Sequence, residues 1–241
     1  MYKGDLLGYK VVQYGLSNNA GSFYFQMYSS DSGNWTFQFV GTERHIYNRL
    51  PSNPINLNGY LHWLCRDDTQ ALVAYNFYAF EWICRVIPLP ERSASNFADT
   101  LTISCGSLMY MNTNRGGQLN QQLKIWRLKK YTSGSSKESW ELVWDLMLGL
   151  CLATEPVAMH PFVEEIIYFV TRQTDYSETH AYLVSGNLHT KNFQLHEYWN
   201  QKHRELGDYK SHLFHQFVFP QRLSSIPCPP GCTLVTLPDQ H

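Results

Sequence analysis

The strongest constraint on this chain is an internal repeat with a period of 47 residues. A strand-like apolar segment ends at Tyr28 and is followed seven residues later by Trp35; the same pair recurs as Tyr75 and Trp82. Self-similarity at a fixed period of this size is the sequence signature of repeat architectures. The chain is therefore expected to consist of several copies of one structural unit.

A second marker repeats at the same distance. The segment Asn58–Trp63 returns as Cys105–Tyr110, and a third copy with a changed turn lies at Glu164–Tyr168. The aromatic pair also has a third copy, Trp126 and Trp140, whose spacing is stretched to 14 residues by a polar insertion that reads as a longer hairpin loop. In each copy of the second marker a turn precedes alternating large residues, which is typical of a strand entered through a tight hairpin.

These units predict an all-β fold, most simply a β-propeller with a complete or incomplete ring. The segments alternate with period two rather than 3.6, which argues against a helical solenoid. A period of 47 lies within the roughly 40–50 residues of propeller blades. Neighbouring blades bury their faces against each other, so large aromatic residues should fill the space between them. A β-sandwich with similar strands stays the alternative fold. The aromatic residues assigned to the blades are Tyr28, Trp35, Trp63, Tyr75, Trp82, Trp126 and Trp140.

We expect one domain over residues 1–241, with a poorly ordered Pro-rich tail at 220–241. Trp82 is expected to be buried, so its replacement by Ala should cost about 3–5 kcal/mol. Terminal strands are expected at Tyr9–Gln13 and His212–Phe219, and their pairing is one way to close the ring. Further strands are expected near Phe23–Ser29, Tyr60–Cys65, Ala71–Tyr75, Leu108–Met111, Leu123–Leu128, Glu141–Asp145, Ile166–Val170 and Ala181–Ser185.

Composition and charge limit the partners. The formal net charge is −1, which gives no attraction to nucleic acid or to an anionic membrane surface. The longest apolar run, Leu142–Ala153, is shorter than the roughly 20 residues that span a bilayer. Six widely spaced cysteines are more typical of reduced thiols than of a secreted disulfide scaffold, which predicts a cytoplasmic or nuclear protein.

No motif for a catalytic nucleophile, a zinc protease or a phosphate-binding loop occurs, so we predict no catalytic residue and no cofactor. His212, His215, Cys228 and Cys232 have a spacing that could hold zinc, but we favour solvent-facing histidines and free cysteines, and predict no metal site. A hydrolase built on a propeller scaffold stays an alternative, because acids on distant blades can meet. The acids considered for it are Glu81, Asp145, Glu164 and Glu165.

Loops are then the expected functional part, since propeller strands form the scaffold. Three loops are polar and rich in turn residues: Arg66–Gln70, Asn112–Gly117 and Lys129–Glu138. The candidate partner-binding residues are Arg66, Asp67, Asp68, Asn112, Asn114 and Arg115.

An ordered series of segments resembles the plant F-box-associated β-propeller domain, a kelch-like domain that follows the F-box in a large family of plant proteins. Each motif alone is weak, but their order and spacing agree from about Gly8 to about Phe219. The segments that carry the resemblance are Gly8–Val12, Gln26–Trp35, Leu57–Leu64, Ala74-Tyr75 with Ile87–Pro90, Gln122–Leu128 with Ser139-Trp140, and His160-Pro161 with Ile166–Phe169.

The resemblance implies a protein-binding module whose target is unknown. In this family the F-box binds the Skp-type adaptor of an SCF ubiquitin ligase, and the propeller receives the target. We identify no F-box in this sequence; Arg49-Leu50-Pro51 is only superficially similar. The adaptor is therefore an expected partner only if an F-box is present elsewhere. A truncated gene product, an isolated domain, a competitor that binds targets and a fragment without independent activity stay open.

Overall fold

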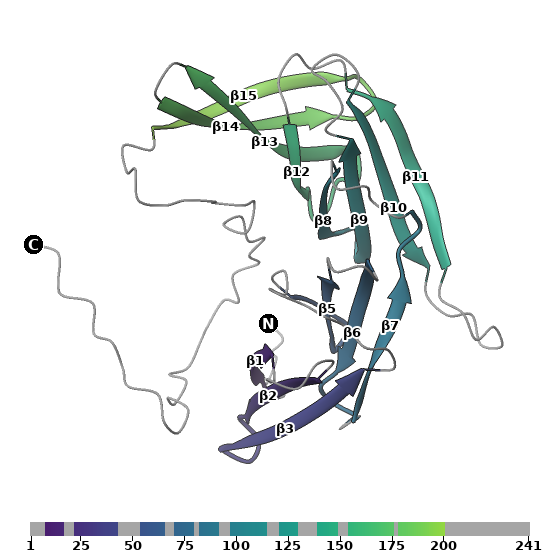
Figure 1. Ribbon diagram of the computed structural model, residues 1–241, viewed down its shortest axis with the longest axis vertical. Coiled ribbons are helices and arrows are strands. Elements are labelled where there is room, and N and C mark those ends of the chain that lie inside the picture. The colour runs from purple at the N-terminus through teal and green to yellow at the C-terminus, as the bar shows by residue number, and fades with distance from the viewer. Residues whose placement is uncertain are drawn as a thin grey trace, which may run out of the picture.

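A computed structural model describes most of the chain up to residue 200, and every regular element in the described residues is a strand. The all-β prediction is confirmed. Successive sheets follow one another along an arc, with β5, β8 and β12 on its inner side and β7 and β11 on its outer side (Figure 1). Among the described residues there is no helix that could cross a membrane. The described ranges are 8–16, 22–42, 54–65, 70–79, 82–91, 97–114, 121–129, 139–148, 154–175 and 178–200.

The described strands fall into four consecutive groups, here called blades. The first blade contains β1 (Lys10–Leu16), β2 (Ser22–Ser29) and β3 (Asn34–Thr42). The second contains β4 (Ile55–Leu57), β5 (Tyr60–Cys65), β6 (Ala71–Asn76) and β7 (Ile83–Pro88). The third contains β8 (Phe97–Ser104), β9 (Ser107–Asn114), β10 (Gln122–Lys129) and β11 (Ser139–Met147). The fourth contains β12 (Thr154–Met159), β13 (Ile166–Asp175), β14 (Glu178–Asn187) and β15 (Asn192–Asn200).

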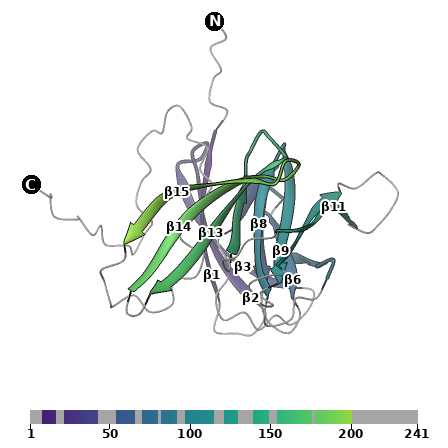
Figure 2. The ribbon, with the colours of Figure 1, turned by 90° about the horizontal axis from the view of Figure 1, so that it is seen from above.

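Within each blade the strands pair antiparallel in chain order. The third and fourth blades are separate four-stranded sheets, with β11 and β15 at their edges (Figure 2). The first two blades join into a seven-stranded sheet through a short parallel contact that pairs Gly41 with Ile83 and Thr42 with Cys84. The strands of the first blade correspond to the last three strands of the other blades.

The repeated turn of the sequence forms the first hairpin of the second and third blades. Asn58 and Gly59 connect β4 to β5, and Cys105 and Gly106 connect β8 to β9. All four residues have positive φ, at 53°, 81°, 47° and 71° in that order. Two-residue hairpins with positive φ at both positions match the right-handed twist of the flanking strands. The prediction of a tight hairpin before each of these strands is confirmed.

The core consists of three apolar clusters, one at each junction between neighbouring blades. Trp63, Tyr110 and Phe169 are the fourth residues of β5, β9 and β13, and each is fully buried in a different cluster. Side chains alternate between the two faces of a strand, so neighbouring residues face opposite clusters. Leu64 of β5, for example, packs in the cluster with the third blade, whereas Trp63 packs in the cluster with the first.

Aromatic contacts cross the first junction. The Trp63 ring meets that of Phe23 edge to face, with 5.0 Å between the ring centroids. The rings of Phe25 on β2 and Tyr75 on β6 are stacked with a centroid distance of 4.2 Å. The Tyr75 hydroxyl donates a hydrogen bond to the side-chain oxygen of Gln38 at 3.1 Å, which satisfies this buried polar group.

A side-chain hydrogen bond crosses the second junction, which lies between the second and third blades. The indole nitrogen of Trp140 on β11 donates a hydrogen bond to the Pro88 carbonyl at the end of β7, at 2.8 Å. The Trp140 ring also lies 5.9 Å from that of Tyr110. One long side chain from the outer strand therefore connects the third blade to the second.

The aromatic residues that the sequence assigned to the blades differ in how deeply they are buried. Trp63 and Tyr75 are fully buried, Tyr28 is buried beside Trp35, and Trp126 and Trp140 are half-buried. Each of the strands expected within the described range is present, and β1 extends the strand expected at Tyr9–Gln13 to Leu16. The expected strand at His212–Phe219 and the tail at 220–241 lie outside the described residues.

The prediction that Trp82 is buried is wrong, because its side chain is 72% exposed. In the first blade β2 ends at Ser29 and β3 begins at Asn34. Trp35 is therefore the second residue of β3 and pairs with Tyr28 across the hairpin. In the second blade β6 ends at Asn76 and β7 begins only at Ile83. The longer connection leaves Trp82 before its strand although the sequence spacing is the same.

This difference yields a stability test. We expect Trp63→Ala to lower the free energy of unfolding by about 3–5 kcal/mol, because it leaves a large cavity between two blades. Trp82→Ala should change it by less than about 0.5 kcal/mol, as exposed substitutions do. Denaturant midpoints of the two variants measure both effects. Equal midpoints would contradict the assignment of Trp63 to the junction.

Candidate interaction groove

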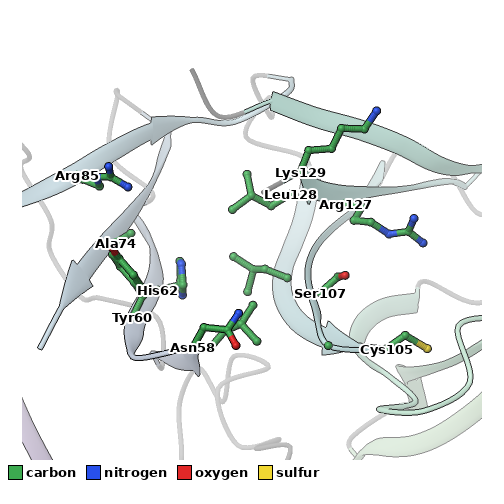
Figure 3. A pocket seen from close by; sticks show the side chains of 13 residues that line it. Asn58, Tyr60, His62, Ala74, Arg85, Cys105, Ser107, Arg127, Leu128 and Lys129 are labelled. Atoms are coloured by element: carbon green, nitrogen blue, oxygen red, sulfur yellow. The ribbon is translucent and has the colours of Figure 1, made fainter. Parts of the chain in front are cut away.

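An open groove of about 920 Å³ lies between the second and third blades (Figure 3). Its walls are the first hairpins of the two blades together with parts of β5, β6, β7, β9 and β10. A volume of this size is within the range of ligand sites in proteins. The lining residues are Leu57, Asn58, Tyr60, His62, Ala74, Arg85, Cys105, Gly106, Ser107, Leu108, Arg127, Leu128 and Lys129.

The sequence repeat builds the lower border of the groove. Asn58 and Cys105 are 47 residues apart, occupy the same position in the hairpins of neighbouring blades, and both line the groove. Glycine is required at position 59 by its surroundings as well as by its positive φ, because a Cβ atom there would lie 2.7 Å from a ring carbon of Tyr78. A Cβ atom at Gly106 would meet nothing within 4 Å.

The floor of the groove is apolar. Ala74 and Leu108 are buried members of the cluster between the second and third blades. Leu57, Tyr60 and Leu128 are half-buried and pack against the same cluster. The groove is thus the open end of a blade junction, where apolar side chains of the core reach the surface.

His62 is the buried titratable group of the groove, with 7% of its surface exposed. Burial lowers the pKa of His62 from its ordinary value of 6.5, and the backbone carbonyls of Ile55 and Tyr60 partly oppose this effect. The ring is therefore neutral at neutral pH. Its Nδ1 atom has no hydrogen-bond partner among the described residues. A buried polar atom without a partner costs free energy unless a ligand or water satisfies it.

Cationic side chains come from both blades. Arg85 belongs to β7, and Arg127 and Lys129 belong to β10, on the other side of the groove in Figure 3. Arg127 pairs with Glu164, which precedes β13, and lies 3.6 Å from Glu141. Lys129 lies 3.4 Å from the same Glu141 carboxylate. Leu128 points into the groove, whereas Arg127 and Lys129 on either side of it point away from the groove, toward these two glutamates (Figure 3).

The acids considered for hydrolysis take part in separate contacts. Glu164 pairs with Arg127, whereas Asp145 on β11 accepts a hydrogen bond from the Gln122 amide at 2.6 Å. Glu81 lies outside the described residues. Within the part of the chain that the structure describes, no group of three or more His, Cys, Asp or Glu side chains could hold a metal ion. The four candidate zinc ligands also fall outside that part.

The predicted partner-binding residues do not meet in this groove. Asn112 was expected in a loop, but it lies within β9 and is 1% exposed, so that prediction is wrong. β9 is a central strand, and Asn112 pairs with Asp99 on one side and Lys124 on the other, which keeps this polar residue in the sheet. Asn114 is the last residue of β9 and half-buried. Arg66, Asp67, Asp68 and Arg115 lie outside the described residues.

Sequence reasoning missed most of the groove. Lys129 was included as the first residue of a predicted loop, but His62, Arg85 and Arg127 were not selected. They lie on three different strands and come together only because the two blades pack side by side. The available signal was the pair of equivalent turns, Asn58-Gly59 and Cys105-Gly106, since equivalent turns of adjacent repeats border the same junction.

The chain is similar to a family of plant proteins over nearly its whole length. The model of the F-box protein At3g26010-like β-propeller family matches residues 1–228. The putative F-box protein At3g23970 of Arabidopsis thaliana is 36% identical over 208 residues, which cover 82% of this chain and 48% of that protein. The putative F-box protein At3g23950 is 32% identical, covering 95% of this chain and 60% of the relative. The putative F-box/kelch-repeat protein At4g22430 is 28% identical, covering 96% and 59%. The chain thus spans about half to three-fifths of these relatives.

The burial of His62 predicts a pH dependence of stability. The unfolded chain takes up a proton on His62 below about pH 6.5, whereas the native ring resists protonation. Because the unfolded state then binds more protons, the free energy of unfolding falls as the pH falls through this value. Urea unfolding is measured at about pH 7.5 and 5.5. The free energy of unfolding should decrease less between these pH values for His62→Gln than for the original chain. An equal decrease in both proteins would contradict the burial of this ring.

The two hairpin glycines form a matched pair for a second test. Gly59→Ala and Gly106→Ala both impose a left-handed backbone on a residue with a Cβ atom, which costs about 1 kcal/mol. Gly59→Ala must in addition displace the Tyr78 ring. We expect Gly59→Ala to lower the midpoint temperature of thermal unfolding more than Gly106→Ala does. The opposite order would show that Tyr78 does not cover this turn.

Proposed function

Because this chain belongs to the F-box protein At3g26010-like β-propeller family, we propose that it is the target-receiving interaction module of an F-box-type ubiquitin ligase and is not itself an enzyme. The printed names of its relatives identify F-box proteins, and one of them an F-box/kelch-repeat protein. In such a division of labour, the propeller holds the protein to be modified and the F-box holds the ligase. The target is a protein whose identity specific side chains determine, not the fold.

The observation that carries this proposal is the groove between the second and third blades. It is open to the surface, has an apolar floor and carries polar side chains around its border. Protein-binding sites combine a buried apolar centre with a polar rim. The lining residues belong to paired strands and two-residue hairpins, which favours a site that needs little ordering on binding.

The Skp-type adaptor is assigned to a different segment. We propose that adaptor binding requires an F-box in addition to the propeller, since the family resemblance places that contact in the F-box. A module that works with a ubiquitin ligase of this kind belongs in the cytoplasm or the nucleus. This assignment agrees with two described cysteines, Cys65 and Cys84, that are fully buried and form no disulfide.

The test is a capture experiment with a variant that fills the groove. Leu128→Trp enlarges a half-buried side chain that points into the groove (Figure 3), whereas the control variant Phe162→Ala changes a 76% exposed side chain of the fourth blade. Protein recovered from plant extract on the immobilised chain is quantified by mass spectrometry. A target should be retained by the original chain and by Phe162→Ala, and reduced at least about tenfold by Leu128→Trp.

Two results would contradict the proposal. If no recovered protein differs in amount between the groove variant and its control, the result would favour a fragment without independent binding. Stoichiometric recovery of the Skp-type adaptor by the chain alone would show that adaptor docking does not need a separate F-box. Unfolding midpoints of both variants must be close to that of the original chain, so that loss of binding is not loss of folding.

A further inference from the structure

We propose that residues 212–219 supply a first strand for the first blade and pair with β1 along the edge opposite β2, so that the end of the chain joins the arc of blades to its beginning. This pairing is a property of the domain and does not depend on the proposed function. The segment lies outside the described residues, so its place is inferred from the described strands and from the sequence.

Among the described residues, the first blade is one strand short of the other three. The second strands of those blades, β5, β9 and β13, each pair with a strand on both sides. β1 holds the same position in its blade, but among the described strands it pairs with β2 alone and ends the seven-stranded sheet. The strand that the described first blade lacks is therefore the counterpart of β4, β8 and β12.

The edge of β1 has the chemistry of a strand that accepts a neighbour. β1 extends over seven residues, Lys10–Leu16, and includes Val11, Val12 and Tyr14. Long edge strands rich in β-branched and aromatic residues present backbone N–H and C=O groups that pair readily with another strand. A strand supplied by the chain itself pairs with these groups and covers an edge on which other chains could add.

Residues 212–219 have the side-chain pattern of a strand that packs on both faces. Apolar side chains fall on each face of such a strand, Leu213 and Phe217 on one and Phe214 and Val218 on the other. Strands that are covered on both faces need apolar residues at neighbouring positions rather than a strict alternation with polar ones. The first strand of a blade between two neighbouring blades is covered in this way.

The position of the segment in the chain suits this role. Pro220 follows it directly, and a proline ends strand pairing because it has no N–H to donate. The β-propeller family model matches residues 1–228 and so includes the segment. Residues 201–211, which connect it to β15, can span about 40 Å when extended, more than the roughly 30 Å diameter of a small domain. A connector of this length suits a crossing between the first and fourth blades, which lie at the two ends of the arc (Figure 1).

The residues before β1 suit the role less well. In the second and third blades, the first and second strands are joined by two residues that both have positive φ. Before Lys10, Gly8 has positive φ, but Tyr9 continues along β2, since its carbonyl accepts a hydrogen bond from the Ser30 N–H at 2.9 Å. The chain therefore does not enter β1 through the hairpin that the other two blades use.

Photocross-linking of the full chain identifies the neighbour of β1. Gln13, which is exposed, is replaced by p-benzoylphenylalanine, and the products are mapped by mass spectrometry of tryptic peptides. Opposite side chains on adjacent strands lie about 5 Å apart, within reach of this probe. We expect a cross-link within one chain to the tryptic peptide 211–222, which contains the whole segment. The same probe at Phe162, an exposed residue between β12 and β13, should not give this product.

Hydrogen exchange measures whether the segment protects β1. N–H groups of neighbouring residues point to opposite edges of a strand, so one of Phe217→Pro and Val218→Pro removes an N–H that faces β1. The amides of β1 should exchange at least about tenfold faster in that variant. The control Ser224→Pro places a proline beyond Pro220 and should leave this exchange unchanged. Unchanged exchange in β9 shows that the rest of the fold is intact.

Several results would overturn the inference. A cross-link from position 13 to residues 1–7 would place the N-terminal residues beside β1, and a product of doubled mass would place a second copy of the chain there. Absence of the product with peptide 211–222, or equal exchange of β1 in the original chain and all three proline variants, would exclude the pairing. These outcomes do not involve the groove, so the capture experiment with Leu128→Trp tests the proposed function separately.

Discussion

The packing of large side chains between consecutive blades is the interaction on which the rest of this structure depends. A single twisted sheet of three or four strands has two faces, and both must be covered for it to be stable. Trp63, Tyr110 and Phe169 repeat at the same position of the second strand and bury their rings at successive junctions. The corresponding position of β1 is Gln13, which is exposed and has no described blade before it. The arc of sheets in Figure 1 is thus built by repetition of one contact.

The groove follows from the same repetition. The groove lies at the junction of two blades beside their first hairpins, and both hairpins are two-residue turns because the sequence repeats them. The core cluster therefore opens to the surface at Leu57 and Leu128, and Arg85 of β7 lies on the wall of the opening. The described lining of the groove belongs to strands and short hairpins of neighbouring repeats, and not to long loops.

The sequence predicted the repeating parts of the fold more accurately than the candidate groove. The turns at Asn58-Gly59 and Cys105-Gly106 and the strands after them depend on local chemistry, and local chemistry is readable. The Trp82 prediction is wrong because equal spacing in sequence does not imply equal hairpin length. The Asn112 prediction is wrong because β9, whose backbone pairs with a strand on each side, continues past Asn112 to Asn114. The walls of the groove were missed since residues such as Arg85 of the second blade and Leu128 of the third come to one site only through packing between blades.

A double-mutant cycle between Phe25 and Tyr75 tests the central claim most directly, because these stacked rings belong to different blades and lie 4.2 Å apart. Free energies of unfolding are measured for the original chain, Phe25→Leu, Tyr75→Leu and the combined variant. If the blades pack as described, the two substitutions are coupled by about 0.5–1.5 kcal/mol, as expected for an aromatic pair in contact. Additivity within about 0.3 kcal/mol would show that the two rings do not touch, and would contradict packing of the first blade against the second.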